Sequence, residues 1–197
     1  VTTTNNISVP SGSITTSADS TFNGVIVGKG GGNVSSNVRV GNGTLNATAT
    51  GGNNVAIGTN AMSNVTSGLN NVGIGGAALG NALSTGQANI GIGYAALAFN
   101  NSSYCNAVGT QALYSNTTGS FNNALGRLAL YNNVSGSNNV GVGEQALTNN
   151  TTAGNLTAVG YTALANNTTN VATLGTITGG SGYTNGTYTG VVMTLSS

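Results

Sequence analysis

The chain has 197 residues, of which five are charged and none is histidine, so its formal net charge is +1. One Asp, one Glu, one Cys and no His cannot supply a catalytic triad, a carboxylate pair or a zinc cluster, so the composition argues against an enzyme, a metal site or any other cofactor. Three basic residues without a cluster are a poor surface for nucleic acid, and no stretch approaches the roughly 18 apolar residues of a membrane span.

Residues 1–36 precede any repeat and are predicted to form a connecting or capping segment. The 33 Gly, 32 Asn, 29 Thr and 19 Ser of the whole chain are typical of low-complexity sequence. Disorder normally combines low hydrophobicity with high charge, whereas here 38% of residues are hydrophobic and 3% are charged. The regular spacing of the apolar residues favours a folded repeat protein.

Residues 37–170 form eight copies of a repeat of about 17 residues. Each copy is marked by a glycine that follows an aliphatic residue. These structural glycines are Gly41, Gly58, Gly75, Gly93, Gly109, Gly126, Gly143 and Gly160. A unit of this length cannot close a core by itself, so the copies are expected to stack into a rod. With strands about 4.8 Å apart, eight copies would rise roughly 40 Å.

A short strand is predicted immediately before each marker glycine. Val or Ile directly precedes the glycine in all but one copy, which has Leu125, and a second aliphatic residue stands two positions earlier in five copies. Alternate residues of a strand share one face. We therefore expect the aliphatic pairs to form the buried side of a stack of parallel strands.

A corner is predicted after each marker glycine. Leu, or Met62 in one copy, stands four residues after the glycine and is preceded by Ala in every copy except the first. Gly-x-x-Ala-Leu is too short for a helix, so it indicates a corner or a single helical turn that places Leu in the core. Turns rich in Asn follow, most regularly at 116–119, 133–136 and 150–153.

An asparagine stands four residues before the marker glycine in six of the eight copies. These residues are Asn37, Asn54, Asn71, Asn89, Asn122 and Asn139. Stacked amides can hydrogen-bond along such a ladder and so satisfy buried polar groups without charge. Cys105 and Leu156 take the other two places, and Cys105 is interpreted as a small buried residue rather than a reactive thiol.

Residues 171–197 are rich in Gly, Tyr and Thr and are predicted to form a C-terminal β segment. The fold class expected for the chain is all-β, with the repeats forming a parallel β-roll or β-solenoid.

Two familiar motifs occur inside the repeats. Residues 73–78, 91–96 and 141–146 match a dinucleotide fingerprint, but the next strand begins too soon for a βαβ unit. Asn-x-Ser/Thr triplets, which can accept N-linked glycans, begin at Asn46, Asn64, Asn116, Asn133, Asn150 and Asn167. Turn-forming Asn-Thr pairs would give the same pattern, and we favour that interpretation.

Aromatic residues are concentrated in the middle of the chain. Exposed rings on a rigid rod could stack on sugars, which makes Tyr94, Tyr114 and Tyr131 candidate glycan contacts. Packing between repeats or between subunits is the favoured alternative.

The repeats resemble the head repeats of trimeric autotransporter adhesins of the YadA type. The resemblance is carried by segments such as NNVAIGTNA at 53–61 and NNVGVGEQA at 138–146. It implies a left-handed parallel β-roll in which three chains pack around a common axis as an intertwined homotrimer. Similar repeats, with the longer turn seen here, occur in bacteriophage tail-fibre and other virion structural proteins, and the flanks at 18–32 and 179–191 look phage-like.

The function expected from these observations is that of a structural rod. The leading hypothesis is a homotrimeric rod of a virion appendage, such as a phage tail fibre, that supports host attachment and joins other appendage proteins. The alternative is an adhesin at the bacterial cell surface that binds host glycan or matrix. A third hypothesis, an ice-binding solenoid, ranks last because Thr-x-Thr pairs are not repeated in register.

Overall fold

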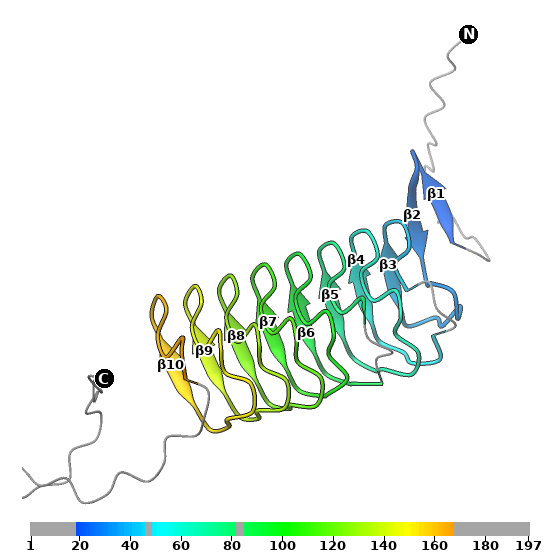
Figure 1. The fold of residues 1–197 in the computed structure, drawn as a ribbon. Coiled ribbons are helices and arrows are strands. Elements are labelled where there is room, and N and C mark those ends of the chain that lie inside the picture. The colour runs from blue at the N-terminus through cyan, green and yellow to red at the C-terminus, as the bar shows by residue number, and fades with distance from the viewer. Residues whose placement is uncertain (1–18, 46–48, 82–84, 168–197) are drawn as a thin grey trace, which may run out of the picture.

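The chain is all-β in the computed structural model, which describes residues 19–45, 49–81 and 85–167. Ten strands and no helix occur in these residues, and the strands form one sheet in chain order (Figure 1). The strands are β1 (Ser20–Phe22), β2 (Val25–Gly28), β3 (Val38–Val40), β4 (Val55–Ile57), β5 (Val72–Ile74), β6 (Ile90–Ile92), β7 (Asn106–Val108), β8 (Asn123–Leu125), β9 (Val140–Val142) and β10 (Thr157–Val159). The predicted segment 171–197 lies outside the described residues, as do 1–18 of the N-terminal segment.

The repeats form a parallel β-solenoid, as predicted. Each strand from β3 to β10 pairs in parallel with the same three positions of the next strand, for example Val55 with Val72 and Ile57 with Ile74. The chain therefore climbs by one strand for every coil of about 17 residues, and the coils stack into an elongated body (Figure 1).

The expectation that the aliphatic pairs form the core of the chain is wrong. In β7 the middle residue, Ala107, is fully buried, whereas Val108 is 37% exposed. The other parallel strands follow the same alternation, with Gly, Ala or, once, Arg39 pointing inward. The aliphatic side chains thus lie on the outside of the coil, and the small residues between them face its interior.

The core is built by the leucine, or Met62, that follows the marker glycine in the first seven coils. In the eighth coil the predicted core residue Leu164 is 46% exposed, because no described coil stacks on that end. Leu113 is fully buried and adopts φ = 50°, in the left-handed region that is unfavourable for a non-glycine residue. The predicted corner is present, but it consists of turns and contains no helical turn. The equivalent buried residues of the other coils are Leu45, Met62, Leu79, Leu97, Leu130 and Leu147.

Close approach between coils requires glycine at the seven markers from Gly41 to Gly143. Gly75 has φ = 126°, and a Cβ atom there would lie 2.5 Å from the carbonyl oxygen of Gly93 in the next coil. No side chain fits at that distance, which explains why glycine recurs once per coil.

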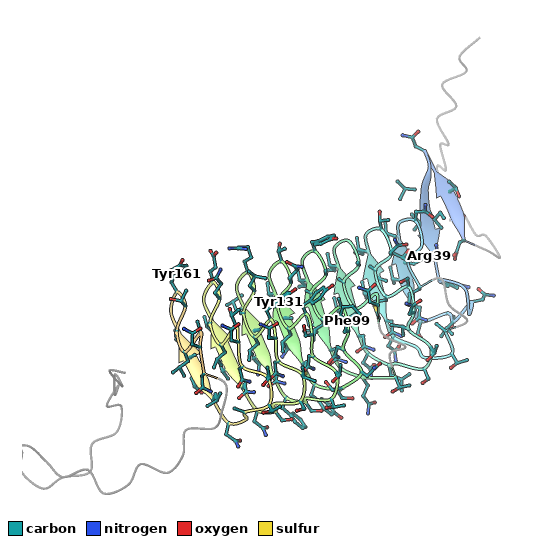
Figure 2. All side chains as sticks on the ribbon, viewed as in Figure 1. Arg39, Phe99, Tyr131 and Tyr161 are labelled. Carbon is teal, nitrogen blue, oxygen red and sulfur yellow. The ribbon has the colours of Figure 1, made fainter. Side chains whose placement is uncertain are left out.

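A hairpin caps the N-terminal end of the solenoid. Strands β1 and β2 are antiparallel, and β2 pairs with β3. Arg39, the one charged residue at an inward position, extends to the carboxylate of Asp19, with Nη1 and Oδ2 2.9 Å apart. The other oxygen of Asp19 accepts the backbone N–H of Lys29 at 2.6 Å. Figure 2 shows Arg39 at this end of the stack.

Replacing Asp19 with alanine is expected to destabilise the capped end, because it leaves the guanidinium of Arg39 buried without its partner. Breaking a buried ion pair costs about 3–5 kcal/mol, and since the Asp19 side chain is 23% exposed we expect a value near the low end. The free energy of unfolding from guanidinium titration measures the loss. Asp19→Ala with Arg39→Ala is the matched control, because alanine is the usual residue at this inward position. Equal losses in the single and double variants would contradict this role of the ion pair.

Candidate functional site

The interior of the solenoid contains the predicted asparagine ladder. The backbone N–H of Asn54 donates to Oδ1 of Asn37 at 2.9 Å, and Nδ2 of Asn54 donates to the carbonyl oxygen of Gly68 at 2.8 Å. In the next coil the backbone N–H of Asn71 donates to Oδ1 of Asn54 in the same way. The asparagine side chains therefore supply hydrogen-bond partners to backbone N–H and carbonyl groups at the corners, outside the paired strands.

A second asparagine ladder was missed by the sequence analysis. Nδ2 of Asn133 donates to Oδ1 of Asn116 at 2.8 Å and to the carbonyl oxygen of Gly136 at 2.9 Å. That carbonyl also accepts Nδ2 of Asn122 at 2.7 Å, so the two ladders meet at one turn. The members of the second ladder are Asn100, Asn116, Asn133 and Asn150, all fully buried. Their regular place seven residues after the marker glycine was the signal that could have revealed them.

Three of the glycosylation triplets begin at members of the second ladder. Asn116, Asn133 and Asn150 are fully buried, and each uses its amide nitrogen in hydrogen bonds. A glycan cannot be attached to an amide nitrogen in this position, so these triplets specify turns. Asn46 lies outside the described residues.

Cys105 occupies its place in the first ladder as a buried thiol. Its backbone N–H donates to Oδ1 of Asn89 at 2.9 Å, and its Sγ lies 3.3 Å from the carbonyl oxygen of Gly119. Burial raises the pKa of the Cys105 thiol, which favours its protonated form. The interpretation as a small interior residue is consistent with these contacts.

Replacing Asn133 with alanine is expected to destabilise the solenoid strongly. It removes the donor to Asn116 and the acceptor for Asn150, and each buried partner left unsatisfied costs about 1–3 kcal/mol. Asn132→Ala is the matched control, because Asn132 also bonds to the next coil but does so on the surface. We expect a change within about 0.5 kcal/mol for the control in chemical denaturation. Similar losses in the two variants would show that the buried ladder adds nothing specific.

The sheet has an exposed outer face, formed by the first and third residues of strands β3–β10. The third residue is aliphatic in every strand, and Leu125 and Val159 there are 51% and 70% exposed. The first residue is aliphatic in five strands and is Asn106, Asn123 or Thr157 in the others. No charged residue occupies either column in the described strands. Exposed apolar columns of this kind are typical of surfaces that contact a partner.

The three tyrosines predicted as glycan contacts are only partly brought together. Tyr114 stacks on Tyr131 with ring centroids 5.1 Å apart, and Phe99 packs edge-on against Tyr114 at 5.1 Å. The Tyr114 ring therefore has two aromatic neighbours. Tyr94 is 61% exposed and lies in a different column, directly after a marker glycine. Figure 2 shows Tyr131 and Phe99 on the body of the stack.

A second aromatic stack was not singled out from the sequence. Tyr104 and Phe121 lie parallel with ring centroids 5.0 Å apart, and they are 47% and 53% exposed. Each stands two residues before the first residue of its strand, so the pair borders the outer face at β7 and β8. Their spacing of 17 residues was the available signal.

Groups suited to catalysis are sparse across the described part of the chain. No three His, Cys, Asp or Glu side chains gather there into a group that could hold a metal ion. Helices that could cross a membrane are likewise absent from the described ranges.

The ion pair of Arg127 with Glu144 is exposed and joins two successive coils.

No protein-family model, curated protein or solved structure matches this chain. The assignment of a function therefore depends on the surfaces described above and on the resemblance of the repeats.

Proposed function

We propose that the chain is a structural rod of a virion appendage, such as a phage tail fibre, that spans distance and supports host attachment. The observation that carries the proposal is the aliphatic outer face on a stack of repeated coils. In a single chain this face would be in water, at a cost of about 25 cal/mol for each Å² of apolar surface left exposed. A partner that covers this face would remove the cost, and a stack covered in this way would act as a shaft.

The partner that best fits the outer face is another copy of the same chain. The aliphatic columns repeat once per coil, and a second solenoid presents the same columns at the same spacing. The resemblance of the repeats favours three copies around a common axis, so the proposed assembly is a homotrimer. In such a shaft the function is mechanical, and it needs no cofactor, nucleic acid or membrane.

The buried polar groups suit a shaft of this kind. Two amide ladders and the strand pairings run in the same direction, so each coil is hydrogen-bonded to the next at the sheet and at the corners. Separating two coils would break all of these bonds together, which favours slow unfolding and resistance to proteases.

The alternative is an adhesin at the bacterial surface that binds host glycan or matrix. The exposed ring of Tyr94 and the stack of Tyr104 on Phe121 favour it, because exposed aromatic rings can pack on sugars. The stacking of Tyr114 on Tyr131 and its contact with Phe99 reduce its value as a sugar platform.

Immunogold electron microscopy with an antibody against the chain tests the proposed function. Labelling of filaments that project from purified virions is expected. Labelling of the bacterial envelope in the absence of virions would favour the adhesin, and no labelling of either would contradict both functions.

A further inference from the structure

Two amides interrupt the outer face at the middle of the stack. Asn106 and Asn123 occupy the first position of β7 and β8, where the strands on either side have Ile90 and Val140. Nδ2 of Asn106 donates to Oδ1 of Asn123 at 2.8 Å. Among the described residues no further side-chain hydrogen bond is made by Oδ1 of Asn106 or Nδ2 of Asn123. The pair thus presents one acceptor and one donor outward.

These amides favour association of two copies in register and disfavour association out of register. A polar group buried in an apolar interface without a hydrogen bond is costly, whereas two amides that meet can satisfy each other. If two copies lie parallel and level, the amides of one face the amides of the other. If one copy slips by two coils or more, the amides face only valine, isoleucine or threonine.

An antiparallel arrangement is also penalised. It can bring the two amide pairs together only if its twofold axis passes between β7 and β8. In that arrangement β5–β10 of the two copies face one another, and β3 and β4 remain uncovered. A parallel arrangement in register covers all eight strands.

We propose that Asn106 and Asn123 fix the parallel, in-register alignment of copies of this chain at the outer face. The inference rests on the self-association in the proposed function and adds the device that sets its register. A single polar residue in an apolar seam sets register in the same way in coiled coils. The stacked rings of Tyr104 and Phe121 border the same two coils, so they mark the same level of the assembly.

The experiment compares the native chain with Asn106→Val/Asn123→Val, which restores the aliphatic residue of the other strands. Nitroxide labels are placed on Ser67→Cys or Thr152→Cys, two exposed positions of the same column near opposite ends of the stack. Cys105 is fully buried and is not labelled. Distances between labels are measured by double electron–electron resonance, and the mass of each assembly by sedimentation. Asn132→Val/Asn149→Val is the matched control, because it removes an equivalent amide pair away from the outer face.

With native amides we expect one narrow distance, the same at both positions. The Asn106→Val/Asn123→Val variant should remain associated but give added or broadened distances, while the control keeps the single distance. An unchanged single distance in the variant would overturn the register inference and leave self-association standing. A native chain that sediments as a monomer would overturn both.

Discussion

Replacing Leu113 with alanine is expected to lower the free energy of unfolding by about 2–5 kcal/mol, the range for a buried leucine whose removal leaves a cavity. Leu113 is fully buried between the equivalent leucines of the neighbouring coils, Leu97 and Leu130, and all three belong to one core cluster. The stacked coils restrict collapse around the cavity, so the loss should be close to the upper end. Guanidinium titration followed by circular dichroism measures it.

Leu125→Ala is the matched control for Leu113. It removes the same atoms from the outer face, where the side chain is 51% exposed in a single chain. At a protein concentration too low for association we expect little change in the stability of the coil. A larger loss at Leu125 than at Leu113 would contradict the placement of Leu113 in the interior of the coil and of Leu125 on its outer face.

Replacing Val108 with glutamate is expected to weaken self-association by roughly a hundredfold or more. A buried carboxylate without a partner costs several kcal/mol, and about 1.4 kcal/mol corresponds to a factor of ten in affinity. Symmetry places the charge in every copy at the same level, which adds repulsion between like charges. Sedimentation velocity over a range of concentrations measures the change in the association constant.

The control for Val108 is Thr118→Glu, an exposed position in the turn that follows Asn116. It adds the same charge away from the outer face, so association should be unchanged. Circular dichroism should show the same strand content for both variants. If the two charges weaken association equally, the contact surface lies elsewhere.

The stacked fold could be predicted because the same pattern of residues recurs in eight copies along the chain. A glycine recurs at almost constant spacing, and the structure explains it by the approach of each coil to the next, as at Gly75. The alternation of apolar and small residues also predicted the strands correctly, because residues two apart must share a face.

The alternation of residue types could not predict which side chains of each strand point into the coil. A period of two says which residues share a face but does not say which face points inward. The interior is already filled by the corner leucines. A Cβ atom on Gly73 would lie 2.7 Å from Cγ of Met62, which takes the leucine place in the preceding coil. Only small residues fit opposite such a side chain, so valine and isoleucine point outward. Arg39 takes the inward position in β3, which has no coil before it.

The second amide ladder was hidden by its local sequence. Asn133 is followed by Val-Ser-Gly, which is typical of an exposed turn. Its burial depends on stacking against Asn116 and Asn150 in the coils on either side, a contact between residues 17 apart. Turn propensity describes the backbone correctly but does not report where the side chain points.

The mass of the native chain in solution tests the central claim most directly. The claim is that the aliphatic outer face is an interface between copies of this chain, and the proposed homotrimer has three times the monomer mass of 19.1 kDa. Sedimentation equilibrium should therefore give a trimer that dissociates when Val108 becomes glutamate. A mass of 19.1 kDa that does not change with concentration would contradict the account.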